Sequence, residues 1–122
     1  MNEKGIIGKL GEDRACAYLE SCGYRIIDRN FRCRAGEIDI IAASGNTICF
    51  AEVKTRRSLS FGLPREAVGR TKKARIKRAA AYYLLCHREY ARYGQRMDVI
   101  EMLHIDEKWY VNHIESAFGE GE

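Results

Sequence analysis

The sequence predicts one α+β domain in which helices pack on a mixed central sheet. Three observations lead to this class: helical periodicity in two segments, two strand-like apolar runs joined by Gly45-Asn46, and alternating segments near the end of the chain. The expected element order is α-β-β-β-α-β-β, which is typical of layered α/β or α+β domains. A chain of 122 residues is long enough for a single core, so we expect residues 1–122 to form one domain.

The first expected helix runs from about Glu3 to Cys22. Gly23 is suited to end it, because glycine readily adopts the left-handed conformation found just after helices. Glu12 lies on a stripe of small and apolar residues at helical spacing. If the helix packs on the sheet, Glu12 points toward the acids described below. If Glu12 lies at the edge of the stripe, it points into water, and the sequence leaves both open.

A strand over about residues 24–31 and a basic turn over 32–36 are expected to lead into a hairpin. Residues 38–42 and 48–53 are strand formers, and Gly45-Asn46 between them is typical of a tight two-residue turn. The register that follows pairs residues outward from this turn. The hairpin is therefore the best-defined local structure in the chain.

That register decides whether two acids face each other. It places Asp39 opposite Glu52 and Glu37 opposite Lys54 on one face, whereas the other face, which includes Ile38 and Ile40, is wholly apolar and expected to be buried. Like charges directly opposite on a sheet are destabilising, so the pair favours a divalent cation between the carboxylates. The alternatives are an exposed face that tolerates both acids and a register shifted by one residue, which would separate them.

The second half of the chain continues the alternation of elements. Residues 55–63 are expected to form a loop beside the acids that could move over a substrate. Pro64 is placed to open a helical turn to about Gly69, and Thr71 is a suitable N-cap for a helix to about Tyr90. Strands over 96–104 and 108–114 are expected to complete the sheet.

Two features of these segments each have a functional and a structural interpretation. Tyr82 and Tyr83 could stack on nucleic-acid bases, although tyrosines at this spacing are more often part of a core. Asp98 could be a further acid of the site, but we favour a structural partner for a nearby arginine.

Composition and cysteine usage indicate a cytoplasmic protein. Hydrophobic residues make up 46% and charged residues 31%, which is ordinary for globular proteins. No apolar run approaches a membrane span, and the first residues lack the layout of a signal peptide. The five cysteines include no C-x-x-C spacing, and neither they nor the three histidines suggest a zinc site. We therefore expect reduced thiols, no membrane partner and a cytoplasmic location.

The positive charge is concentrated in one segment. Residues 54–78 contain ten Lys or Arg and a single acid, so their net charge is +9 in a chain of net charge +4. Such a block suggests a polyanionic partner, and a solvated helix face is the alternative. Because the block begins at Lys54, beside the acids, nucleic acid is favoured. The bases expected to contact it are Arg56, Arg57, Arg70, Lys72, Lys73 and Lys77.

The acids and one lysine form the pattern D-x(12)-E-x-K over Asp39, Glu52 and Lys54. Two carboxylates suit Mg²⁺, which prefers oxygen ligands and keeps several waters, and the carbonyl of Val53 is a further candidate ligand. A lysine on the same strand face can stabilise the charge of an attacked phosphate. The pattern thus predicts metal-assisted phosphodiester hydrolysis. A salt bridge between Lys54 and Glu37 is the structural alternative for the lysine.

Residues 36–41, Gly-Glu-Ile-Asp-Ile-Ile, followed by 52–56, Glu-Val-Lys-Thr-Arg, resemble the core motif of the PD-(D/E)-x-K nuclease superfamily. The whole chain resembles the bacterial YraN-like family, small proteins without an established function, with matching stretches that include Gly8 to Glu12, Asn30-Phe31-Arg32 and Asp98-Val99-Ile100. The resemblance implies a restriction-endonuclease-like core and a metal-dependent nuclease, with Holliday-junction resolvases among the relatives. It implies metal ligation by Asp39 and Glu52, and Lys54 as the catalytic lysine. Glu12 matches an acid that resolvase-like members carry on the first helix, and Glu37 replaces the proline of the motif.

The sequence therefore predicts a hydrolase, an endonuclease that uses Mg²⁺ or Mn²⁺ and acts on DNA, including branched DNA. A homodimer is expected if the substrate is a two-fold junction, because such a substrate needs two sites. A non-catalytic nucleic-acid-binding module that keeps the fold is the alternative. An interaction protein with another acidic partner is the third possibility that the residues leave open.

Overall fold

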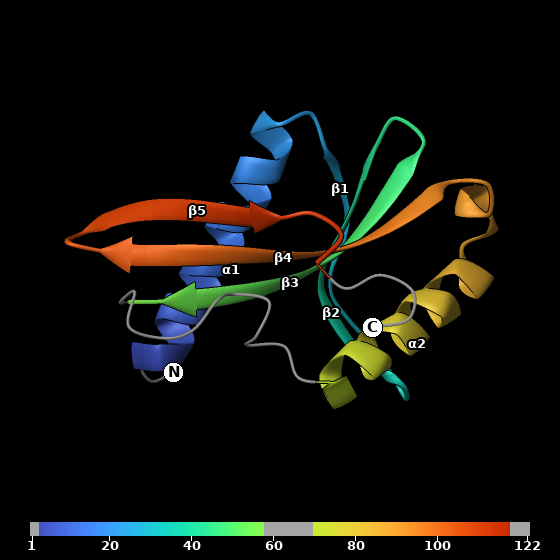
Figure 1. Ribbon diagram of the computed structural model, residues 1–122, viewed down its shortest axis with the longest axis horizontal. Helices are drawn as coiled ribbons and strands as arrows, with labels where there is room; N and C mark the ends of the chain where they lie inside the picture. Colours follow the sequence, from blue (N-terminus) through green and yellow to red (C-terminus); the bar gives the residue numbers. More distant parts are fainter. Residues whose placement is uncertain (1–2, 58–69, 118–122) are drawn as a thin grey trace.

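The computed structural model describes residues 3–57 and 70–117 of the chain. Within these residues the elements follow one another as α-β-β-β-α-β-β, which confirms the predicted α+β class (Figure 1). They are α1 (Glu3–Ser21), β1 (Arg25–Cys33), β2 (Gly36–Ser44), β3 (Thr47–Arg56), α2 (Arg70–Cys86), the 3₁₀ turn η2 (Arg88–Tyr90), β4 (Gly94–Ile105) and β5 (Lys108–Ile114). None of the described helices combines the length and apolarity that a bilayer crossing requires.

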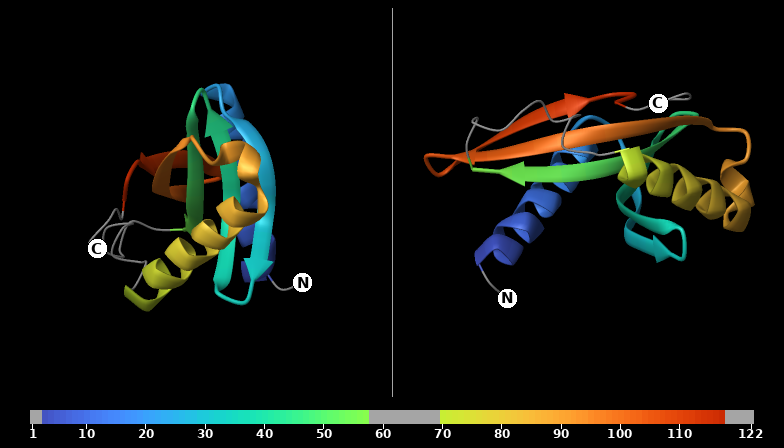
Figure 2. Two further views of the ribbon diagram at one scale, coloured as in Figure 1. Left: turned by 90° about the vertical axis from the view of Figure 1, so that its right-hand side faces the viewer. Right: turned by 60° about the horizontal axis from the view of Figure 1, so that its bottom comes forward.

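The five strands of the described part of the chain form one mixed sheet in the order β1-β2-β3-β4-β5. All neighbours are antiparallel except β3 and β4, which are parallel. Parallel neighbours need a crossover connection, and α2 lies in the connection between these two strands. When the molecule is turned so that α2 faces the viewer, α1 lies behind the strands (Figure 2). Within residues 3–57 and 70–117, the sheet therefore has one helix on each face.

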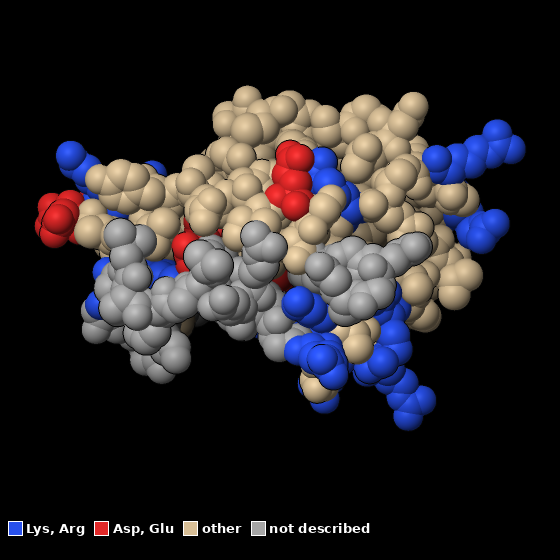
Figure 3. All heavy atoms as spheres, viewed as in Figure 1, with Lys and Arg blue, Asp and Glu red and all other residues tan. Residues whose placement is uncertain are grey.

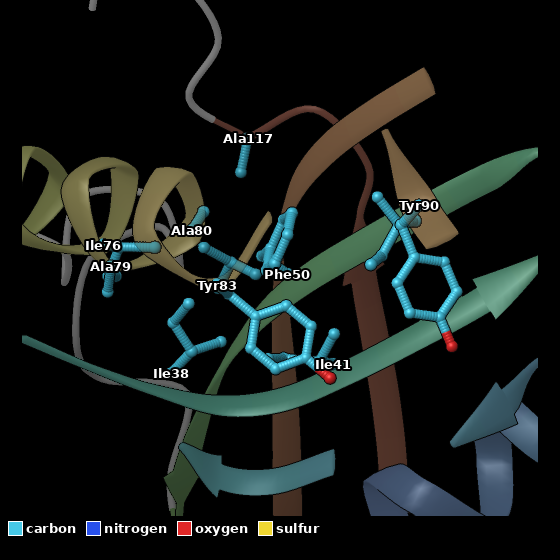
Figure 4. Close-up of a cluster of buried hydrophobic side chains, with 11 residues drawn as sticks. Ile38, Ile41, Phe50, Ile76, Ala79, Ala80, Tyr83, Tyr90 and Ala117 are labelled. Atoms are coloured by element: carbon cyan, nitrogen blue, oxygen red, sulfur yellow. The ribbon is translucent and has the colours of Figure 1, made fainter. Parts of the chain in front are cut away.

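Two hydrophobic clusters hold the helices against the sheet. Under α2, the buried residues Ile76, Ala79, Ala80 and Tyr83 follow the spacing of an amphipathic helix and pack on strand residues that include Phe50 (Figure 4). Under α1, a second cluster joins Ala15, Cys16 and Leu19 to Ile40, Cys49, Ala51 and Ile100. The central strands β2 and β3 are thus buried on both faces, which explains their nearly continuous apolar sequence.

The hairpin of β2 and β3 has the predicted turn and the predicted register near it. Gly45 adopts a positive φ of 56°, and pairing runs from Ser44–Thr47 to Ile40–Ala51. Beyond that pair, the two strands have no further register partners. The prediction that the ladder continues through the two acids is therefore wrong, and the reason lies in the site described below.

The ends of α2 differ from the prediction. Thr71 lies inside the helix, which has already begun at Arg70, so it is not the N-cap. The helix ends at Cys86 because His87 leaves the helical conformation, with φ −127° and ψ 74°. Its Nδ1–H donates instead to the carbonyl of Tyr83 at 2.9 Å, which satisfies an acceptor that the helix end leaves open. The loop predicted over residues 55–63 begins later than expected, because β3 continues through Thr55 to Arg56. The rest of that loop and the helical turn predicted to about Gly69 lie outside the described residues.

A close contact between α1 and β3 determines how closely α1 packs on the sheet. A β-carbon added at Gly11 would overlap Oγ1 of Thr55 and lie 3.1 Å from its Cβ. Only glycine allows the helix to lie this close. Because Glu12 follows directly, the contact also fixes how near its carboxylate comes to β2 and β3.

Replacing Gly11 by alanine is expected to lower the free energy of unfolding by about 1–3 kcal/mol, because the methyl group forces α1 away from Thr55. Urea unfolding followed by circular dichroism measures the change. Gly8→Ala is the matched control in the same helix: its β-carbon would meet no atom within 4 Å, and alanine favours a helix by up to about 1 kcal/mol. Similar stabilities for the two variants would contradict the tight contact.

Candidate functional site

A cavity of about 710 Å³ opens where α1, the ends of β2 and β3, and the start of α2 meet. All four predicted catalytic residues line it: Glu12 from α1, Asp39 from β2, and Glu52 and Lys54 from β3. Val53, the further candidate ligand, lines it as well. The other described residues that line it are Ile7, Gly8, Glu37, Thr55, Arg56, Arg57 and Lys72. The fold therefore brings together the acids and lysine that the motif singled out.

The strands part at Asp39 because its side chain takes over a backbone hydrogen bond. The N–H of Val53 donates to Oδ2 of Asp39 at 2.8 Å. By the register of the hairpin, the same N–H would meet the carbonyl of Ile38 in a continued ladder. The carboxylate thus replaces the neighbouring strand as acceptor, and the hairpin opens into the cavity.

The side-chain alternation of β2 reverses at the same place. Ile38 packs in the cluster under α2, whereas Ile40 packs in the cluster under α1. Residues two apart on a regular strand share a face, so the prediction that both belong to one apolar face is wrong. The neighbouring strand is also irregular here: Asn30 has a φ of 53° and lies between the partners of these two residues. Asp39 lies at this reversal and lines the cavity.

Electrostatics make Asp39 an unusual carboxylate. Burial raises its pKa to about 7, with further contributions from the nearby charges of Glu52 and Glu12. The hydrogen bond from Val53 opposes this shift only in part. The predicted repulsion between the two acids is therefore present, although the residues are not ladder partners.

Glu52 is buried, with 4% of its surface exposed, and its charge is balanced by two lysines. The Lys72 ammonium contacts Oε1, and Nζ of Lys54 lies 3.6 Å from the same oxygen. Burial and the neighbouring Lys72 lower the pKa of Lys54. Burial lowers the pKa of Lys72, but the contact with Glu52 outweighs this effect and raises the pKa above its ordinary value. Asp39, Glu52 and the two lysines form one cluster, which we call the acid centre. Nothing in the sequence spacing of α2 indicated that Lys72 belongs to it.

Glu12 and Glu37 border the cavity with partners of their own. Oε1 of Glu12 accepts hydrogen bonds from Nδ2 of Asn30 at 2.9 Å and from Nη2 of Arg29 at 3.4 Å. Glu37 pairs with Arg32 at 3.1 Å, whereas Lys54 pairs with Glu52. The alternative pairing of Lys54 with Glu37 is therefore not what the structure shows.

The other predicted nucleic-acid contacts lie in different surroundings. Arg56 pairs with the buried Glu101 at 2.5 Å across the parallel strands β3 and β4. Arg57 is exposed and lines the cavity, and Arg70 is exposed at the start of α2. Lys73 and Lys77 are half-buried on α2. Arg56 therefore helps to hold the sheet together at the edge of the cavity.

Asp98 lies outside the cavity and has a structural role. It is fully buried and accepts hydrogen bonds from Arg96 at 2.9 Å, from Nε2 of His113 at 2.6 Å and from the backbone N–H of Ser116 at 3.0 Å. The hydroxyl of Tyr18 bonds with Nδ1 of the same histidine. Although burial opposes it, these donors lower the pKa of Asp98 to about 2. This confirms the arginine partnership expected for Asp98.

The acid pair suits a divalent cation of the magnesium type. Asp39 and Glu52 present carboxylate oxygens from adjacent strands to one cavity. Among the described residues, no group of three His, Cys, Asp or Glu side chains could hold a metal ion. Mg²⁺ often uses only one or two carboxylates and keeps its waters, so the pair fits that ion better than one needing a closed side-chain cage. Lys72 now provides the positive charge beside Glu52.

A protein-family model described as "Uncharacterised protein family UPF0102" matches residues 11–102. The chain belongs to this family. The match covers the cavity residues from Glu12 through Lys72 and agrees with the YraN-like resemblance of the sequence. It establishes the relationship and leaves the activity to be inferred from the site.

Curated relatives of the UPF0102 family match nearly the whole chain. A UPF0102 protein of Alkaliphilus oremlandii is 50% identical over 119 residues, which cover 97% of this chain and 100% of the relative. One of Syntrophus aciditrophicus is 50% identical over 111 residues, covering 91% and 87% of the two chains. One of Caldicellulosiruptor saccharolyticus is 46% identical over 121 residues, covering 97% and 100%. Their names state no activity.

Replacing Asp39 by asparagine is expected to stabilise the protein more at pH 8 than at pH 5. The folded-state pKa of about 7 lies above the ordinary value of 3.8, so the folded protein keeps a proton that the unfolded chain releases. Stability from this group is therefore present at low pH and is lost as pH rises toward 7. Asparagine carries no charge and still accepts the Val53 N–H.

Urea unfolding in the presence of a chelator measures this effect. The gain in stability for Asp39→Asn at pH 8 should exceed that at pH 5 by on the order of 2 kcal/mol. Glu37→Gln, an exposed acid on the same strand, is the control and should show no such difference. Equal gains for Asp39→Asn at both pH values would mean that ionisation of this carboxyl does not strain the fold.

Proposed function

We propose that this protein is a metal-dependent nuclease that hydrolyses phosphodiester bonds in DNA. The observation that carries the proposal is the meeting of two repelling, largely buried carboxylates, Asp39 and Glu52, with Lys54 in one open cavity. Burying like charges together costs stability unless a cation or a proton compensates. Such an arrangement is more typical of a functional site than of a structural one.

The acids and the lysine that line the cavity would each have a role in this reaction. A bound Mg²⁺ or Mn²⁺ would lower the pKa of a water and polarise the phosphate. Asp39 and Glu52 would hold the ion, with the Val53 carbonyl as a further candidate ligand. Lys54, two residues from Glu52 on β3, would place its positive charge on the phosphate oxygens. Glu12 adds a third acid at the rim of the same cavity.

Lys72 acts in this scheme as a built-in counter-ion. It balances Glu52 before the metal arrives, and a cation binding between the acids would displace it. Because Lys72 lines the cavity, its ammonium would then remain within reach of a substrate phosphate. The same lysine would thus stabilise the unliganded site and help to bind the nucleic acid.

The charge distribution favours nucleic acid as the substrate. Arg57, Lys54 and Lys72 line the cavity, and they belong to the segment of net charge +9. Contacts of this kind bind phosphates with little regard to sequence. The motif resemblance adds branched DNA as the finer expectation, with a homodimer acting on a junction in the cytoplasm.

A non-catalytic nucleic-acid-binding module is the second candidate, and one observation favours it. Lys54 and Lys72 already balance the charge of Glu52 from within the chain. A module of this kind would bind DNA equally well with and without metal. The requirement for a cation therefore separates the two candidates.

Cleavage of labelled single-stranded, duplex, flap and four-way-junction DNA in Mg²⁺ and in Mn²⁺ tests the proposal. Glu52→Gln and Lys54→Met should each reduce the rate by at least about 100-fold, because each removes a group that stabilises the transition state. Glu107→Gln and Lys108→Met, at the exposed turn between β4 and β5, are the matched controls and should cut like the wild type. Cleavage that survives in Glu52→Gln or in chelator would come from another enzyme.

Metal affinity gives a test that does not depend on cleavage. Lys72→Met should bind Mn²⁺ several-fold more tightly than the wild type in isothermal titration calorimetry, because the ammonium no longer competes for Glu52. Lys73→Met, at the next position of α2, is the control and should leave the affinity unchanged. No Mn²⁺ binding by either variant or by the wild type would favour the non-catalytic module.

A further inference from the structure

A second cleft adjoins the cavity lined by Asp39 and Glu52, which we call the acidic cavity. It has a volume of about 540 Å³ and lies between the turn that joins β1 to β2 and the first turns of α2. Glu37 and Lys72 line both hollows, so the cleft and the cavity lie next to each other. Arg32 lines the cleft from the side of β1, and Arg75 lines it from the side of α2. A chain leaving the acidic cavity past Lys72 would therefore meet two arginines.

Glycine at position 36 sets the width of this cleft. A β-carbon there would lie 3.0 Å from the Cβ of Arg75 and 3.1 Å from its carbonyl oxygen. The turn that carries Gly36 thus packs directly against the backbone of α2 at Arg75. Arg32 pairs with Glu37, but both side chains are exposed. Exposed ion pairs are weak, so a phosphate can replace the carboxylate as the partner of Arg32.

The outer face of α2 continues the path away from the cleft. Thr71, Arg75, Arg78 and Tyr82 follow one another at spacings of four, three and four residues, so they share one side of the helix. All four are exposed, and α2 contains no acidic residue. The space-filling view shows Lys and Arg side chains gathered over α2 (Figure 3). This stripe is complementary in charge to a phosphate backbone.

Tyr82 gives the stripe an aromatic end. Half of its surface is exposed, at 50%, whereas the neighbouring Tyr83 is 1% exposed and belongs to the core. Its ring stacks on that of Phe31 from β1, with centroids 6.4 Å apart and planes inclined by 26°. Phe31 itself packs against the core cluster and so supports the outer ring. A supported ring with an open surface beside arginines is a site on which a base can stack.

We propose that the second cleft and this stripe form a track for a single-stranded segment of nucleic acid. Its phosphates lie against Arg32, Arg75 and Arg78, and one base stacks on Tyr82. Only an unpaired base offers a free face to a protein ring, because bases inside a duplex are covered by their neighbours. The inference rests on the proposed function, since the track begins at the acidic cavity, and it specifies a substrate with unpaired bases beside the bond that is cut.

Binding measured apart from cleavage tests the track. Fluorescein-labelled oligo(dT), oligo(rU) and a duplex of equal length would be titrated in chelator, with Glu52→Gln as the background, and followed by fluorescence anisotropy. Tyr82→Ala should weaken single-strand binding about 5- to 100-fold, in line with the loss of one base stack, and duplex binding less than twofold. Tyr82→Phe keeps the ring and should bind like the background protein. The two oligomers show whether the track prefers DNA or RNA.

Tyr110→Ala is the matched control, because Tyr110 on β5 is 51% exposed and lies outside the stripe. Arg78→Gln should weaken binding and lower the salt slope by about one, whereas Arg92→Gln, an exposed arginine outside the stripe, should not. Equal effects of Tyr82→Ala and Tyr110→Ala, or no single-strand binding at all, would overturn the track. Binding that depends on Tyr82 without any cleavage would retain the track and reject the nuclease.

Discussion

The site depends on one hydrogen bond, in which the Val53 N–H donates to the carboxylate of Asp39. This bond ends the ladder between β2 and β3, so the two strands part where a regular hairpin would continue its pairing. It also holds the carboxylate beside Glu52 despite the repulsion between them. The parting of the strands makes room for the cavity, and α1 completes its wall through Glu12 because Gly11 permits close packing.

Two aspartates show how hydrogen-bond donors and neighbouring charges decide whether a carboxylate shielded from water is ionised. Asp98 receives hydrogen bonds from Arg96, His113 and a backbone amide, and its pKa falls to about 2. Asp39 is shielded from water, accepts a hydrogen bond from the Val53 N–H and lies near two other acids, so its pKa rises to about 7. The first carboxylate stabilises the fold as an anion. The second is held in a state that a cation would relieve, which is the physical basis of the proposed metal site.

The helix α2 connects the core, the acid centre and the basic surface. One side carries Tyr83 into the cluster under the helix, and another side exposes Arg78 and Tyr82. Between these sides, Lys72 reaches back to Glu52. A single helix can do this because successive residues point about 100° apart, so a short sequence serves three surroundings. The proposed catalytic and binding surfaces are therefore tied to one packed element.

The sequence by itself determined the order of the elements, the turn of the hairpin and its register as far as Ile40–Ala51. These features depend on turn chemistry and on alternation between residues close in sequence. The pairing of Asp98 with an arginine is also local, because Arg96 is only two residues away. Only the tertiary structure decided that the strands part beyond that pair and that Lys72 joins the acid centre. It also assigned Arg56, predicted to bind phosphates, to a buried partner on β4. Such contacts join segments far apart in sequence, and their geometry follows from how helices and strands pack rather than from local pattern.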